Sequence, residues 1–292
     1  MNKKIFLTLS LLLLLTLVVN GQEDVEEKSV QDYTPSVLMD KGQTEFKLYN
    51  SLFTQIEFFD TLGVRTNDVK RSSILTSIVE YNHGVSNRVT LGGEMWFKST
   101  YIGSETSSAM NVLRFTNSSD SRTGIALIGM KVRYYPVKKW ERFSIQTSIL
   151  LSVISDPQSE KLDRPFIDNN RHLWRTKFLY DKKISNKFQA FTQLSAWVSI
   201  DKNLEDENTG IATPFDLFIS YFPTKKITIY LHNQFFLSIG TNGISSYFLQ
   251  EGLGIKYQLF RGVELETSYT SIIVGENIGA GQTFNLALRI IH

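Results

Sequence analysis

Period-two alternation of apolar and polar residues is the feature of this sequence that most constrains its fold, and it is clearest between residues 247 and 291. Three segments there, separated by short breaks, carry apolar side chains at nearly every second position. In the last segment Phe284, Leu286, Leu288 and Ile290 alternate with asparagine, alanine and arginine. A period of two is that of a strand and not of a helix. Such strands suit either a soluble sandwich, with its polar faces in water, or a transmembrane barrel, with its apolar face in lipid.

The first 21 residues predict export. Lys3 and Lys4 precede an uncharged, mostly apolar run from Ile5 to Val19, which the small residue Gly21 follows. This order of regions is that of a secretory signal peptide, so residues 1–21 are expected to be the signal and cleavage to follow Gly21. The alternative is a retained anchor, but the run is shorter than the roughly 20 residues that a membrane-spanning helix needs.

Composition limits what the mature chain can be. No other apolar stretch approaches the length of a membrane helix, so a mature chain that spans a membrane would have to be a barrel. The sequence contains no cysteine, which excludes disulfides, thiol nucleophiles and cysteine metal sites. It has 31 basic and 29 acidic residues, and loss of Lys3 and Lys4 with the signal leaves equal numbers. A net charge of zero argues against nucleic acid as a partner.

The mature chain divides at about residue 44. Residues 22–43 begin acidic, contain Pro35 and follow neither period, so we expect a flexible periplasmic lead-in. Residues 44–292 form a series of strand-like segments, most about as long as a tilted strand needs to be to cross a bilayer. The twelve expected strands are approximately 44–58, 72–83, 88–99, 122–134, 142–153, 172–181, 187–200, 214–221, 226–238, 247–258, 262–274 and 282–291.

The connections between these strands alternate between long and short. The long ones are at about 59–71, 100–121, 154–171, 201–213, 239–246 and 275–281, and the short ones at 84–87, 135–141, 182–186, 222–225 and 259–261. Bacterial outer-membrane barrels have this asymmetry, with short periplasmic turns and long outer loops, whereas a sandwich has no reason for it. The sequence therefore predicts an all-β protein, a membrane-spanning antiparallel up-and-down β-barrel of about twelve strands, in the bacterial outer membrane, with both termini periplasmic.

Two short motifs carry a resemblance to a known family. They are Ser220-Tyr221-Phe222-Pro223-Thr224 and the stretch from Gly279 to Arg289, GAGQTFNLALR, within the range 44–292. This range resembles outer-membrane β-barrel proteins of the transporter-like family associated with the phenol meta-degradation pathway. The resemblance implies a pore for small organic compounds, without catalytic residues or cofactors. Outer-membrane proteins commonly end in an aromatic residue that the barrel assembly machinery reads, whereas this chain ends in Ile290-Ile291-His292.

No motif announces catalysis or a metal site. The four histidines are far apart in the sequence, with no partner at metal-ligand spacing: His83, His172, His232 and His292. The glycine-rich stretch 275–281 lies between two expected strands with no helix to follow, which argues against a phosphate-binding loop. Acidic loops at 156–168 and 201–208 could hold divalent cations, but their spacing matches no calcium loop, and solvated charge is the simpler interpretation.

The inward phase of the expected strands would line the lumen. Its predicted charged residues are Lys47, Arg88, Glu94, Lys98, Lys131, Arg133, Arg142, Arg175, Lys177, Lys256, Glu264, Glu266 and Arg289. Glu264 or Glu266 could pair with basic neighbours. Lys131, Arg133 and Arg142 lack an evident acidic partner and would leave a positive arc at the periplasmic end, which favours anions.

These patterns predict a porin-like channel for small polar or amphiphilic solutes, weakly anion-selective and not an enzyme. Its expected partners are outer-membrane lipid and lipopolysaccharide, the assembly machinery and a small-molecule solute. Two alternatives remain. One is a plugged structural or adhesive barrel, because pore openness is invisible in sequence. The other is a barrel-housed lipase or protease, whose catalytic partners would be neighbours in space only.

Overall fold

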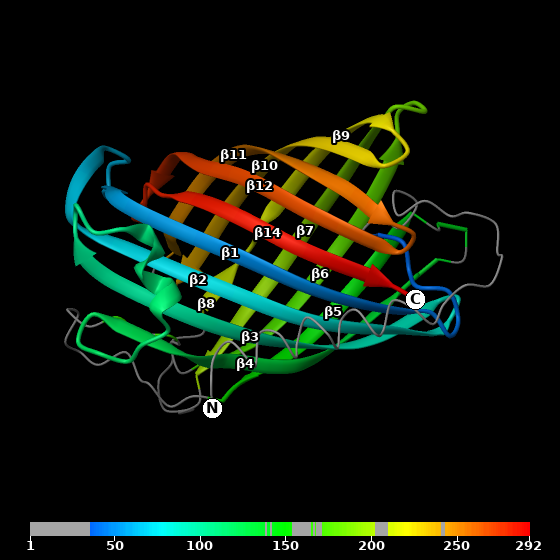
Figure 1. Cartoon of the computed structure of the whole chain (residues 1–292), viewed down its shortest axis with the longest axis horizontal. Coiled ribbons are helices and arrows are strands. Elements are labelled where there is room, and N and C mark those ends of the chain that lie inside the picture. The colour runs from blue at the N-terminus through cyan, green and yellow to red at the C-terminus, as the bar shows by residue number, and fades with distance from the viewer. Residues whose placement is uncertain are drawn as a thin grey trace.

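The computed structural model describes residues 36–137, 139–140, 142–153, 165, 167, 171–201, 210–240 and 243–292. Over this part of the chain the protein is a closed antiparallel β-barrel of twelve long strands, as the sequence predicted (Figure 1). The long strands are β1 (Thr44–Phe59), β2 (Arg65–Ser86), β3 (Val89–Ser104), β4 (Ser121–Tyr134), β5 (Phe143–Ser152), β6 (Arg171–Lys183), β7 (Phe188–Asp201), β9 (Phe215–Thr224), β10 (Ile227–Gly240), β11 (Gly243–Phe260), β12 (Val263–Glu276) and β14 (Gln282–Ile291). Each pairs with its neighbours along the chain, and β1 pairs with β14 to close the ring.

Two short strands extend the ring at the long-loop end. β8 (Gly210–Ala212) pairs with β7 and β10, the same two neighbours that flank β9, so β8 continues the place of β9 in the wall. Pro214 interrupts the two because proline has no backbone N–H to donate to a neighbouring strand. β13 (Ile278–Gly279) likewise continues β14 along β1.

The alternation seen in the sequence separates the outer face from the lumen. Met130, Ile149 and Leu253 are 80%, 61% and 62% exposed on the outer face. The neighbours Lys131 and Ser148 point inward and are buried. An apolar outer face around a polar lumen is the arrangement of a barrel that spans lipid.

Several strands are longer than the sequence suggested. β2 begins at Arg65 where a start at 72 was expected, and β10 and β11 continue to pair as far as Gly240 and Gly243, so residues 241–242 alone join them. Gly243 has a φ of 104°, which glycine adopts without strain, and this permits the sharp reversal. The added residues at these ends, such as 65–71 of β2, carry few apolar side chains and so little hydrophobic alternation to reveal them.

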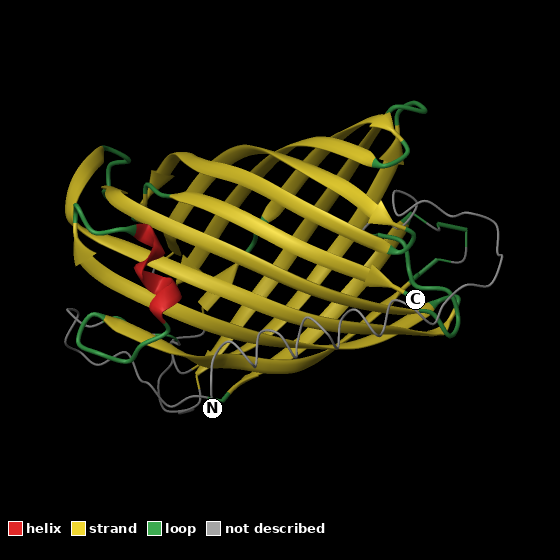
Figure 2. Cartoon of the chain, viewed as in Figure 1, coloured by secondary structure: helices red, strands yellow, loops and turns green. Residues whose placement is uncertain are grey.

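Helix is scarce in the described residues. A 3-10 helix, Ala109–Arg114, lies in the β3–β4 connection (Figure 2). In the part of the chain that the structure describes, no helix is both long enough and apolar enough to span a membrane.

The end of the expected lead-in, residues 36–43, contacts the barrel. The backbone N–H of Ser36 donates to Asp181 Oδ2 at 3.3 Å, and that of Met39 donates to Thr90 Oγ1 at 3.2 Å. Arg133 Nη1 donates to Val37 O at 3.5 Å. Because Asp181 and Arg133 are inward residues of β6 and β4, this segment lies inside the short-turn end of the lumen. A flexible segment was expected as far as residue 43, and residues 36–43 differ from it. The signal peptide, residues 1–21, lies outside the described residues.

Candidate functional site

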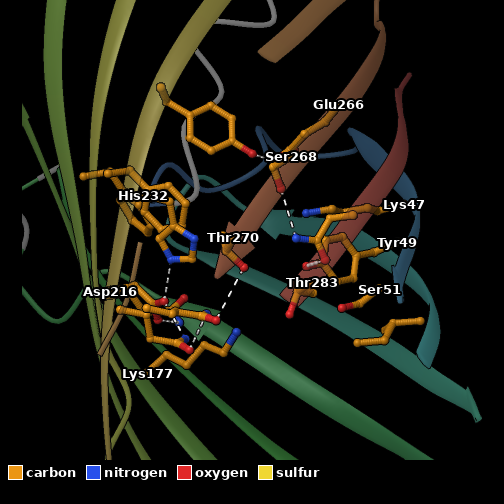
Figure 3. Close-up of a pocket in the computed structure, with 18 of the residues that line it drawn as sticks. Lys47, Tyr49, Ser51, Lys177, Asp216, His232, Glu266, Ser268, Thr270 and Thr283 are labelled. Atoms are coloured by element: carbon orange, nitrogen blue, oxygen red, sulfur yellow. Dashed lines mark hydrogen bonds and ion pairs between the residues drawn. The ribbon is translucent and has the colours of Figure 1, made fainter. Parts of the chain in front are cut away.

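A cavity of about 860 Å³ occupies the lumen, and every long strand contributes at least one inward side chain to its wall. Figure 3 shows Lys47, Asp216, His232 and Thr270 directed into it from four strands. The wall contains both rings and charged groups, so the cavity can accept a solute that is neither wholly apolar nor wholly charged.

Apolar side chains gather toward the long-loop end. Buried Phe59 and Ile272 pack with Phe53 and Phe248, and the ring of Phe248 stacks on Phe236 at 4.9 Å. On the facing wall the buried residues Ala126, Leu127, Leu150 and Ile167 form a second cluster with Trp96 and Leu173. Ile167 belongs to the β5–β6 connection, so part of that connection packs against the inner wall.

Asp216 of β9 anchors a hydrogen-bonded belt along one side of the cavity. Its Oδ1 accepts a bond of 2.7 Å from Gln234 Nε2 and lies 2.9 Å from His232 Nε2, and its Oδ2 accepts a bond of 3.0 Å from Gln193. Gln250 Nε2 in turn donates to Gln234 Oε1 at 2.8 Å. The belt crosses β7, β9, β10 and β11 and satisfies the carboxylate within the protein.

Ion pairs occupy the short-turn half of the lumen. They are Glu45 with Arg289, Glu80 with Lys131, Glu94 with Arg175 and Glu266 with Lys256. Tyr230 adds a hydrogen bond of 2.6 Å to Glu266 Oε1, and Arg133 donates to Gln146 Oε1 at 2.7 Å. The basic groups in these pairs are therefore already neutralised or hydrogen-bonded inside the protein.

A glycine lets one of these pairs skip a strand. Lys131 is on β4 and Glu80 on β2, and the β3 residue between them is Gly92, which pairs in register with Lys131 and with Asn82. A Cβ at Gly92 would lie 3.0 Å from Lys131 Cε and 2.4 Å from Asn82 Oδ1. The lysine side chain can cross β3 because this glycine leaves the space empty.

Lys47 of β1 and Lys177 of β6 differ from the other basic residues of the cavity wall. Both point into the cavity (Figure 3), and among the residues that the structure describes neither has a carboxylate within ion-pair distance. Lys47 is beside Glu80 in register, but Glu80 is bound to Lys131.

The register neighbours of Lys177 explain its lack of a partner. They are Gln146 and Ser195, which carry no charge. Lys47 Nζ lies 5.5 Å from the centre of the Tyr49 ring, which is an uncharged partner. Within the described part of the chain, no carboxylate therefore neutralises Lys47 or Lys177.

The sequence-predicted lumen residues do not all lie at this cavity. Eight of them line it: Lys47, Arg133, Arg175, Lys177, Lys256, Glu264, Glu266 and Arg289. Glu94 and Lys131 are buried beside it in ion pairs, and Lys98 shares the inward phase of β3 with Trp96. Arg88 and Arg142 lie in turns outside the strands, so neither is on the inward phase of a strand as was expected.

Glu80 corrects the predicted positive arc. It and Asp181 are acidic residues that point into the cavity and that the sequence analysis did not include. Glu80 binds Lys131, whereas Arg133 is hydrogen-bonded to Gln146 and to the backbone of Val37. A strict period-two assignment of β2 places Glu80 on the inward phase with Ile78 and Ser72, and this signal could have found it.

No metal centre is assembled within the described ranges, where no group of three His, Cys, Asp or Glu could hold an ion. His232 lies at the aspartate belt, stacked on Phe218 at 4.1 Å, and His172 Nδ1 accepts a bond of 3.2 Å from the backbone N–H of Ser152. The acidic stretches 156–163 and 202–208 lie outside the described residues.

This architecture defines a barrel of the outer-membrane type. Two solved structures share the fold. An outer membrane channel from Pseudomonas putida F1 is 10% identical, with a TM-score of 0.66 over 92% of this chain and 100% of that one. The β domain of the Bordetella autotransporter BrkA is 13% identical, with a TM-score of 0.57 over 86% of this chain and 99% of that one. No family model matches the sequence, and no curated protein matches it.

Proposed function

We propose that this protein is a channel of the bacterial outer membrane for small amphiphilic solutes, weakly selective for anions. Its membrane location is supported by the apolar outer face, by the export signal expected from the sequence and by the fold shared with an outer membrane channel. The single observation that carries the selectivity is a pair of lumen lysines, Lys47 and Lys177, that have no carboxylate partner among the residues the structure describes.

The two lysines favour anions for an electrostatic reason. A solute that enters the lumen loses part of its water shell, and an unpaired ammonium group replaces that water for an anion but repels a cation. Selectivity is weak because the remaining basic groups at the cavity are held in pairs such as Glu45–Arg289 and Glu266–Lys256.

The apolar lining completes the expected solute class. Trp96, Phe191 and Phe218 line the same cavity as the two lysines. A solute with an apolar body and one carboxylate or similar group could place each part against matching side chains. The family resemblance of the sequence would add phenolic compounds to this class.

Planar-bilayer recordings on the refolded full-length protein test the proposal. Under a KCl gradient the reversal potential should indicate chloride preference, and Lys47→Gln or Lys177→Gln should each reduce the chloride-to-potassium permeability ratio by a factor on the order of two. Lys183→Gln is the matched control, because Lys183 is an exposed lysine at the end of the same strand as Lys177. A cation preference in the unmodified protein, or equal effects of all three substitutions, would contradict the proposal.

A plugged barrel is the second candidate, and a specific observation favours it. Ser36 is fully buried and its backbone N–H donates to Asp181 Oδ2 at the short-turn end of the lumen, while Leu38 and Met39 are 4% and 2% exposed. If this segment closes the pore, the unmodified protein should conduct poorly and Asp181→Ala should raise the conductance. Equal conductance of the two proteins would argue against the plug.

A further inference from the structure

The β3–β4 connection, residues 105–120, lies on the outside of the barrel and not over its mouth. Its 3-10 helix contacts β2 and β3, and Figure 2 shows it against the outer face at the end away from the C-terminus. Phe97, Ser99 and Tyr101 of β3 are on the phase opposite to the lumen residue Trp96, so they belong to the outer face. All three contact this connection.

Specific contacts fix the connection to the outer face. Ser99 Oγ donates to Val112 O at 2.6 Å, and the rings of Phe97 and Phe115 pack edge to face at 5.7 Å. Tyr101 Oη donates to Ser107 Oγ at 3.3 Å. These contacts involve Ser107, Val112 and Phe115, so the connection packs on the outer face along much of its length.

Buried polar groups of the outer face lie beside the segment and would otherwise face lipid. Thr54 and Ser73 are hydrogen-bonded to each other at 3.0 Å on the outer face, and Ser73 and Ser99 are 0% and 1% exposed. Arg71 bonds both Thr54 and the backbone oxygen of Glu105 and so joins the wall to the connection. Hydroxyl groups are costly in hydrocarbon, and here protein covers them.

The opposite side of the 3-10 helix is apolar and uncovered. With three residues per turn, Ala109 and Val112 form one ridge and Met110 and Leu113 the next. Val112 is 1% exposed against the wall, whereas Met110 and Leu113 are 58% and 46% exposed. Phe115, directly after the helix, is 47% exposed.

This apolar ridge continues a surface that already faces lipid in the proposed membrane barrel. Ile125 and Ile128 of the neighbouring strand β4 are 38% and 43% exposed on the outer face. Arg114, the basic residue of the last helical turn, is exposed beside the ridge. Apolar side chains next to a cation are the composition of segments that lie at the boundary between acyl chains and phosphate headgroups.

We propose that the 3-10 helix Ala109–Arg114 with Phe115 is an interfacial anchor, whose Met110, Leu113 and Phe115 side chains insert among the acyl chains of outer-leaflet lipid. The anchor rests on the membrane location proposed above but not on conduction. It fixes the depth of this side of the barrel and seals the hydroxyl groups of β1, β2 and β3 from lipid.

Site-directed fluorescence tests the anchor, and the absence of native cysteine makes labelling specific. Leu113→Cys, labelled with bimane, is reconstituted in phosphatidylcholine vesicles with or without a nitroxide at acyl carbon 5. Met130→Cys on β4 is the lipid-facing reference, and Ser119→Cys in the same connection is the water-facing reference. The label at position 113 should lose about half of its fluorescence to the nitroxide lipid, as a shallow lipid contact implies, and Met110→Cys should repeat the result.

The outcomes separate the anchor from the membrane location. Quenching at position 130 without quenching at 113 and 110 overturns the anchor alone. A label at 113 that is protected from both the nitroxide lipid and aqueous iodide lies in a protein contact, which also overturns the anchor. Quenching at none of the positions, in protein whose heat-modifiable mobility shows a folded barrel, overturns the membrane location itself.

Discussion

Replacement of Glu94 by glutamine would measure how much the buried charge pairs of the lumen contribute to stability. Glu94 Oε1 lies 2.5 Å from Arg175 Nη2, and the two side chains are 1% and 6% exposed. At an effective dielectric constant of about 20, unit charges about 4 Å apart attract by about 4 kcal/mol. Removal of one member of a buried pair typically costs about 3–5 kcal/mol, because the other charge stays buried without its partner. Glutamine keeps the shape, so we expect Glu94→Gln to lower the free energy of unfolding by about 3 kcal/mol.

Denaturant titration of the protein in lipid vesicles is the assay, followed by the fluorescence of the four tryptophans. Glu57→Gln is the matched control, since Glu57 pairs with Arg65 where the side chains are 30% and 50% exposed. Solvent screens this exposed pair, so Glu57→Gln should lower the free energy of unfolding by less than about 1 kcal/mol. The double variant Glu94→Gln/Arg175→Met should be less destabilised than the sum of its parts. Equal losses for Glu94→Gln and Glu57→Gln would refute the reasoning.

Three further outcomes follow from the lumen. Lys131→Met should free Glu80 to pair with Lys47, and the reversal potential should move toward cations although Lys131 itself is buried; an unchanged potential would contradict this competition. Gly254→Ala should cost about 1–3 kcal/mol in a denaturant titration, because its Cβ would lie 2.2 Å from the ring of Tyr230. Tyr230→Ala in the same chain should recover part of that loss. Raising KCl from about 0.1 to 1 M shortens the Debye length from about 10 to 3 Å, so chloride preference in bilayer recordings should decrease.

The sequence predicted the fold well because the outer face of a barrel repeats one simple requirement. Every strand must present apolar side chains at alternate positions, and this produced the correct strand number, order and antiparallel pairing. The features that the sequence did not predict follow no such repeat. The first residues of β2 and β11, at the long-loop end, carry few apolar side chains. Residues 36–43 are held partly by backbone N–H groups that donate to side chains of the wall, such as Met39 to Thr90, and a segment without strand periodicity does not reveal such contacts.

The candidate site was less predictable for a geometric reason. The sequence predicts pairs between neighbouring strands, yet Lys131 of β4 reaches Glu80 of β2 over Gly92, and Arg175 of β6 reaches Glu94 of β3. The position that lets Lys131 cross β3 is Gly92, a residue without a side chain to signal the contact. A sequence can therefore reveal which side chains face a lumen before it reveals which of them neutralise each other.

In the channel proposed above, selectivity would depend on competition for carboxylates and not on the excess of one charge. Lys47 of β1 is the register neighbour of Glu80 on β2, but the carboxylate of Glu80 forms its ion pair with Lys131. Lys177 has Gln146 and Ser195 as register neighbours, and Gln146 Oε1 already accepts from Arg133. Among the described residues, the lack of a carboxylate partner at Lys47 and at Lys177 thus follows from contacts that other residues make. A substitution that rearranges one pair changes the charge available to a solute even where it leaves the net charge of the lumen unaltered.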